Sequence, residues 1–141
     1  MTALDDDRLA SLGAAVIRTI PDAVIYADRD GLIRFWNAGA TRIFGFSAEE
    51  AIGQSLDIII PERLRKRHWD GYRHMMETGE GRHGPEDLLA VPATSKSGDT
   101  LSIQFTVTPI HDADGRLAGI AAVLRDVTAT FLELRRLRAG R

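Results

Sequence analysis

The sequence predicts an α+β domain in which one antiparallel sheet carries short helices on one face. Two strand-like runs joined by a turn lie in the first third of the chain, and three more lie in the last third. A block with helical spacing and capping residues separates these two groups, and an amphipathic helix flanks them at each end. Strands and helices in this order are typical of an α+β fold with five antiparallel strands.

The first helix is predicted over 9–20, because Leu9, Leu12, Val16 and Ile20 recur at three- and four-residue steps before Pro21. The runs 23–27 and 32–36 then follow, separated by the turn sequence Asp-Arg-Asp-Gly. This spacing predicts a β-hairpin.

The middle of the chain is predicted to be helical. Asn37 is a good N-cap for a short helix through Phe44, and Ser47 with Glu50 has the spacing of a capping box. The longest helix is expected over 61–79, between a proline suited to a first turn and a glycine suited to the end.

Three strands are expected at 88–94, 101–110 and 117–125, and a second terminal helix follows them. Pro92 indicates an edge position for the first of these strands. The second alternates apolar and polar residues with a period of two. We therefore divide the chain into an N-terminal helix at 1–20, a core domain at 21–128 and a C-terminal helix at 129–141.

The composition limits the function. The 141 residues contain no cysteine, which excludes disulfides, thiolate metal sites and a cysteinyl–flavin adduct. The net charge of −2 favours neither nucleic acid nor an anionic membrane as partner. Residues 5–7 are acidic where a signal peptide is basic, and no apolar run is long enough to span a bilayer. We expect a cytoplasmic protein.

The run from Pro21 to Asn37, the segment Phe44-Gly-Phe-Ser47 and the closing Arg125-Asp-Val-Thr128 resemble the PAS family, in that family's order. The resemblance implies a five-stranded sheet cupped around a pocket, in a sensor that passes its state on through flanking helices. Because the family's functions vary, the fold alone does not fix this one.

Among the histidines, His68 leads to the most specific functional hypothesis. It lies in the stripe Leu64, His68, Tyr72, Met75 of the long helix, on the face expected to look toward the sheet. A neutral imidazole is the usual proximal ligand of haem iron. The plain alternative is a core histidine with a hydrogen-bond partner.

The segment from Pro61 to His68 is also similar to the haem-binding PAS domains of bacterial oxygen sensors, which implies that His68 binds haem b. If the ligand position of that family is instead counted back from Tyr72, it falls on Trp69. The stretch 88–91 also lacks the arginine that those sensors place there. An apolar distal side favours CO or NO, or a redox response, over O2. The predicted cofactor contacts are His68, Leu64, Tyr72, Met75, Leu88, Leu89, Ile103, Phe105, Ala122 and Leu124.

Other residues give weaker alternatives. His83 is a fallback ligand, while His74 and His111 are expected to be exposed. The basic run 63–67 is either a solvated helix face or a partner for haem propionates. Tryptophans and methionines here are more often packing residues than ligands.

We favour a haem b sensor responding to CO, NO, O2 or redox state, not an enzyme, since no acid–base or nucleophile constellation is evident. Its expected partners are a second copy through the terminal helices and a downstream output domain. The competing hypothesis is a PAS interaction module without metal, either empty or holding a small apolar ligand.

Overall fold

The computed structural model describes residues 1–79 and 89–140, and it confirms the α+β class. The five strands form one antiparallel sheet in the order β2-β1-β5-β4-β3. Helices and strands follow each other as α1 (Asp6–Thr19), β1 (Ala23–Asp28), β2 (Ile33–Trp36), α2 (Ala38–Phe44), α3 (Ala48–Ala51), η1 (Leu56–Ile59), α4 (Glu62–Thr78), β3 (Leu89–Thr94), β4 (Thr100–His111), β5 (Leu117–Asp126) and α5 (Thr128–Ala139).

The predicted helix ends are confirmed at several caps. The side chain of Asn37 accepts a hydrogen bond from the backbone N–H of Ala40, and Ser47 forms a complete capping box with Glu50. Gly79 ends α4 in the left-handed region at φ 73°, where a side chain would be strained. Pro92 lies in β3, which is an edge strand as predicted.

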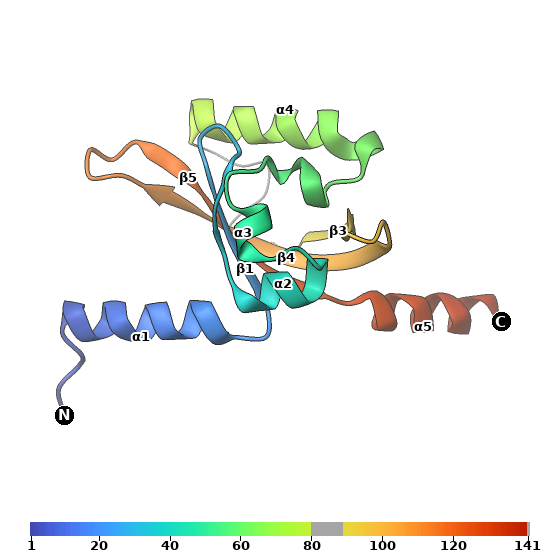
Figure 1. The fold of residues 1–141 in the computed structure, drawn as a ribbon, viewed down its shortest axis with the longest axis horizontal. Helices are drawn as coiled ribbons and strands as arrows, with labels where there is room; N and C mark the ends of the chain where they lie inside the picture. Colours follow the sequence, from blue (N-terminus) through green and yellow to red (C-terminus); the bar gives the residue numbers. More distant parts are fainter. Residues whose placement is uncertain (80–88, 141) are drawn as a thin grey trace.

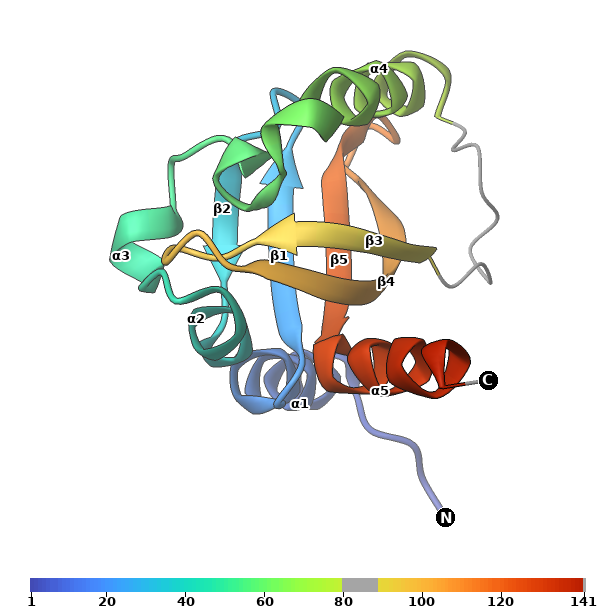
Figure 2. The same cartoon turned by 90° about the vertical axis from the view of Figure 1, so that its right-hand side faces the viewer.

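The sheet is strongly twisted, so that β3 and the adjoining part of β4 run across β1 and β5 (Figure 2). This curvature lets inward side chains from β1, β2, β3, β4 and β5 meet those of α2, α3 and η1 in one cluster, the main core. Its buried members are Ala23, Ile25, Ile33, Trp36, Ala40, Phe44, Ala51, Ile59, Ala93, Ile103 and Leu124. Burying each large side chain of this kind stabilises the fold by about 1.5–3 kcal/mol.

A second, smaller cluster joins α4 to the sheet. It consists of Ala27 on β1, Tyr72 and Met76 on α4, and Leu117 at the start of β5, and we call it the α4 cluster. The helix lies over one end of the sheet, beside the turn between β1 and β2 (Figure 1). The helix is therefore fixed at that end by its C-terminal half.

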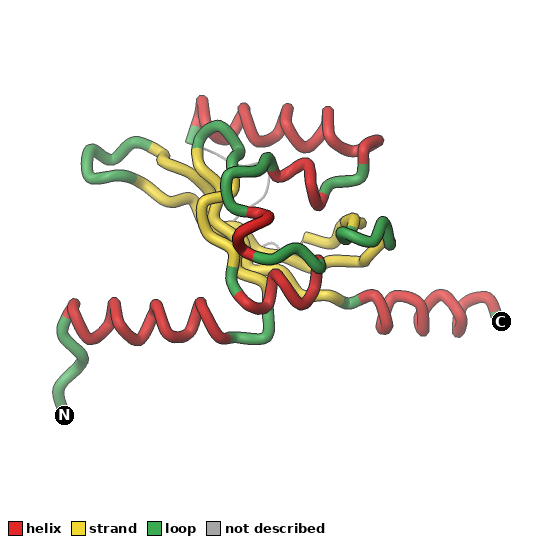
Figure 3. The backbone as a smooth tube through the Cα atoms, in the orientation of Figure 1, coloured by secondary structure: helices red, strands yellow, loops and turns green. Residues whose placement is uncertain are grey.

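The terminal helices α1 and α5 run out from opposite sides of the sheet (Figure 3). Neither helix buries a residue. Their large apolar side chains remain exposed, namely Leu9, Leu12, Val16 and Ile17 on α1 and Phe131, Leu132, Leu134 and Leu137 on α5. Both helices present apolar surface that the described part of the chain does not cover.

Candidate functional site

The histidine with the strongest sequence-based hypothesis lies on the inner flank of α4. His68 stands one turn before Tyr72, which is buried, and two turns before Met76, which is also buried. The imidazole ring lies 4.7 Å from the ring of Trp69 and 5.8 Å from that of Tyr72, centroid to centroid. His68 is thus enclosed on two sides by aromatic side chains from its own helix.

The Nδ1 atom of His68 is buried and has no hydrogen-bond partner within the described residues. Such an atom costs about 1–3 kcal/mol unless a bound group or water satisfies it. Burial lowers the pKa of His68 below its usual value, and the carboxylate of Asp57 offsets this in part. The imidazole is consequently neutral at pH 7, which is the form that binds a metal.

Trp69 fixes the orientation of α4 next to this imidazole. Its indole Nε1 donates a hydrogen bond to Oδ1 of Asp57 at 2.7 Å. Its ring also lies against Gly31 in the turn between β1 and β2, where a Cβ added to the glycine would lie only 2.2 Å from the ring. Trp69 is therefore a packing residue that holds α4 against η1 and the hairpin.

The predicted cofactor contacts fall into two groups. Tyr72 belongs to the α4 cluster, with Met75 packed against it, while Leu64 is half-buried. Ile103 and Leu124 are buried in the main core, with Phe105 and Ala122 packed against that core. The partly buried Leu56 touches both clusters. The strand residues thus pack against the protein's own aliphatic and aromatic side chains.

Some predictions fall on parts of the chain that the structure does not describe. Leu88 and His83 lie outside the described residues, and so does the side chain of Leu89. Of the other histidines, His74 and His111 are exposed as predicted, and His111 is the last residue of β4.

The basic run on α4 divides between two environments. Arg65 points back toward the chain, where its Nε donates to the carbonyl of Ile60 at 3.1 Å. Arg63, Lys66 and Arg67 line a shallow groove together with Asp70, which pairs with Lys66 at 3.0 Å. Arg63 and Arg67 form no ion pair within the described residues, so both remain available to an anionic group.

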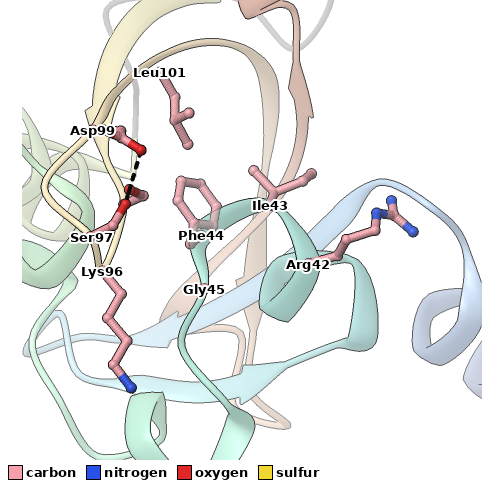
Figure 4. Close-up of a pocket in the computed structure, with 9 residues that line it drawn as sticks. Arg42, Ile43, Phe44, Gly45, Lys96, Ser97, Asp99 and Leu101 are labelled. Atoms are coloured by element: carbon pink, nitrogen blue, oxygen red, sulfur yellow. Dashed lines mark hydrogen bonds between the residues drawn. The ribbon is translucent and has the colours of Figure 1, made fainter.

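A larger groove lies at the end of the core opposite to α4. The periodicity of the sequence did not predict it. It has a volume of about 580 Å³ between the end of α2 and the β3–β4 hairpin (Figure 4). Ile43 and Leu101 supply apolar walls, and Arg42 and Lys96 stand at its rim. Lys96 Nζ pairs with the carboxylate of Glu50 there. Neither of these two grooves includes His68.

A family model described as the PAS fold matches residues 17–130. The chain belongs to the PAS family. The PAS domain of a protein from Colwellia psychrerythraea has the same fold, with a TM-score of 0.74 and 21% identity over 86% of this chain and 98% of that one.

Two sensor proteins are similar to this PAS domain in sequence. The sensor protein FixL of Bradyrhizobium diazoefficiens is 42% identical over 93 residues, which make up 66% of this chain and 18% of FixL. The oxygen sensor protein DosP of Escherichia coli is 28% identical over 120 residues, which make up 84% of this chain and 14% of DosP. The chain thus spans less than one fifth of either relative.

The PAS domain is a sensory module of the kind that these relatives contain. Among its described helices, none is both long and apolar enough to cross a membrane. The division into segments 1–20, 21–128 and 129–141, and a cytoplasmic location, stay predictions.

Proposed function

We propose that this PAS sensory domain holds haem b through the imidazole of His68. The buried, unpartnered Nδ1 of His68 carries this proposal, because a ring nitrogen without a protein partner is suited to a bound group. The lowered pKa of this imidazole also supports it, since only the neutral ring binds iron.

The residues that would hold the group lie on and beside α4. Leu64, Tyr72 and Met75 share the flank of His68 and supply apolar contact. Arg63 and Arg67 have no ion pair within the described residues, so their guanidinium groups suit the haem propionates. When bound, haem iron supplies a site for a diatomic gas or for a change of redox state.

The two relatives support a sensory role of this kind. FixL is named a sensor protein, and DosP is named an oxygen sensor protein. In this chain the stretch 88–91 reads Leu-Leu-Ala-Val, with no basic side chain to hold bound O2. We therefore expect CO or NO to bind more tightly than O2.

Titration of the purified protein with haem b tests the proposal. The expected result is a saturable Soret band at one haem per chain, which His68→Ala abolishes or shifts while the circular dichroism spectrum stays unchanged. His74→Ala is the matched control, because this histidine is exposed on the same helix. A wild-type protein without a Soret band, or equal spectra for the two variants, contradicts the proposal.

The second candidate is a PAS interaction module that binds no metal, and the packing of the sheet favours it. Ile103 is 1% exposed and Leu124 is 8% exposed, both within the main core. The exposed apolar stripes of α1 and α5 provide contact surface for a second copy or an output domain. Light scattering tests this contact surface: we expect a dimer that Leu12→Lys or Leu134→Lys dissociates. The haem titration then separates the two candidates, because this one predicts no Soret band.

A further inference from the structure

The guanidinium group of Arg29 touches two elements that are far apart in the sequence. Arg29 follows β1 directly, in the turn that lies beside the C-terminal end of α4 (Figure 1). Its Nη2 donates a hydrogen bond to the carbonyl of Met76 at 3.3 Å, and its Nη1 donates to the carbonyl of Leu117. One side chain thus bridges the last turn of α4 and the first residue of β5.

Both carbonyls lie at the end of a helix or a strand. Met76 lies in the final turn of α4, whose carbonyls have no partner inside the helix. A cation near that end also suits the helix dipole. Leu117 lies two residues before Gly119, where the pairing of β1 with β5 ends at Asp28. Arg29 therefore continues the attachment of β1 to β5 beyond the end of the strand pair.

A second contact joins the same segment to α4, and here the donor lies on the helix. The hydroxyl of Tyr72 donates to the backbone carbonyls of Ala27 and Asp28. Tyr72 stands one turn from His68, and the two rings are 5.8 Å apart. Within residues 1–79 and 89–140, no side chain other than Arg29 makes hydrogen bonds to both α4 and β5. The short run 27–29 thus joins the flank of His68 to the start of β5.

We propose that Arg29 is a latch that couples the position of α4 to β5, and through β5 to α5. The strand runs from the end of the sheet beneath α4 to the start of α5 (Figure 2). A displacement of the last turn of α4 pulls on Leu117 through a single guanidinium group. The coupling itself is a property of the protein without ligand, while its use in sensing rests on the proposed function at His68.

Hydrogen exchange of the ligand-free protein tests the latch directly. In Arg29→Gln, amides in the last turn of α4 and the first residues of β5 should exchange about tenfold faster together, because a charge-assisted hydrogen bond to each element is lost. Arg29→Lys should fall between this variant and the wild type, since its single ammonium replaces a two-pronged donor. Arg34→Gln is the control: this side chain lies in the same hairpin and bonds the carboxylate of Asp28.

The same variants with haem b separate the latch from the cofactor proposal. Haem is expected to change exchange in both β5 and α5 of the wild type, whereas in Arg29→Gln the Soret band stays and the changes in β5 and α5 disappear. If the changes persist in Arg29→Gln, the latch is overturned. If no haem binds to any variant, the cofactor proposal fails and the ligand-free exchange alone decides: a joint increase at α4 and β5 supports the latch, and an increase at one element or neither overturns it.

Discussion

The side-chain Nδ2 of Asn37 donates a hydrogen bond to the backbone carbonyl of Ile17, 2.7 Å away, and so joins α1 to the PAS core. The same amide nitrogen donates to the carbonyl of Asp22 at 3.0 Å. Its Oδ1 accepts hydrogen bonds from the backbone N–H groups of Val24 and Ala40. One buried amide thus satisfies backbone groups of α1, β1 and α2 at once.

Replacing Asn37 by alanine should therefore cost about 3 kcal/mol of unfolding free energy, because buried N–H groups lose their partner and α2 loses its cap. Urea denaturation measures this loss. Ser47→Ala removes another N-cap, whose hydrogen bond is exposed, and should cost only about 1 kcal/mol. Equal losses for the two variants would show that the hydrogen bonds of Asn37 beyond the cap contribute nothing to stability.

Two glycines in helices should respond to alanine in opposite ways. A Cβ at Gly39 would lie 2.1 Å from the carbonyl oxygen of Asp22, which is backbone and cannot turn aside. Gly71 has no atom within 4 Å of the same position. Gly39→Ala should lose about 3 kcal/mol or more. Gly71→Ala should gain about 0.5–1 kcal/mol, because alanine favours the helix. A pair of thermal melts compares them, and a stable Gly39→Ala protein contradicts the packing of α2 on the α1–β1 linker.

The stability of the ligand-free domain should fall as the pH drops below about 6.5. Burial holds the pKa of folded His68 below its unfolded value of 6.5. In the window beneath that value the unfolded chain binds more protons than the folded one, and protonation therefore favours unfolding. The pKa of Glu50, lowered to about 2 by its hydrogen bond with Lys96, affects stability only below about pH 4.5.

Urea midpoints at pH 7.5 and pH 5.5 measure the contribution of His68. His68→Gln should lose this part of the pH dependence, whereas His74→Gln should keep it. An unchanged pH dependence in His68→Gln would mean that the ring is solvated in the folded protein.

The hydrogen bond between Trp69 and Asp57 should contribute measurably to the docking of α4. Trp69→Phe should cost about 1–2 kcal/mol, because it removes this hydrogen bond at 2.7 Å. In a double-mutant cycle with Asp57→Ala, the coupling energy should be about 1 kcal/mol. Additive losses in that cycle would show that the two side chains do not stabilise the protein through a shared interaction.

Local signals in the sequence accounted for most of the fold. The caps at Asn37 and Ser47, the glycine that ends α4 and the alternation along β4 each depend on a few neighbouring residues. Helix ends and strand faces follow from backbone hydrogen bonding and a fixed side-chain period, and such patterns are visible without the tertiary structure.

The site was predictable only in part. Helical spacing placed His68 and Tyr72 on one flank of α4, and the structure has them there. The contact of Trp69 with Gly31 and the two carbonyls held by Arg29 join segments about 40 or more residues apart, so no local pattern reveals them. The twist of the sheet that buries Ile103 in the main core is likewise a long-range property.

Rescue by a free ligand tests most directly whether the His68 ring binds iron. His68→Gly removes the side chain and leaves space for imidazole added from solution. We predict that haem-loaded His68→Gly regains the wild-type Soret maximum as imidazole is added, saturably and at one haem per chain, while His74→Gly has that maximum from the start. A His68→Gly protein whose spectrum already equals the wild type without imidazole would contradict the assignment of His68 as the haem ligand.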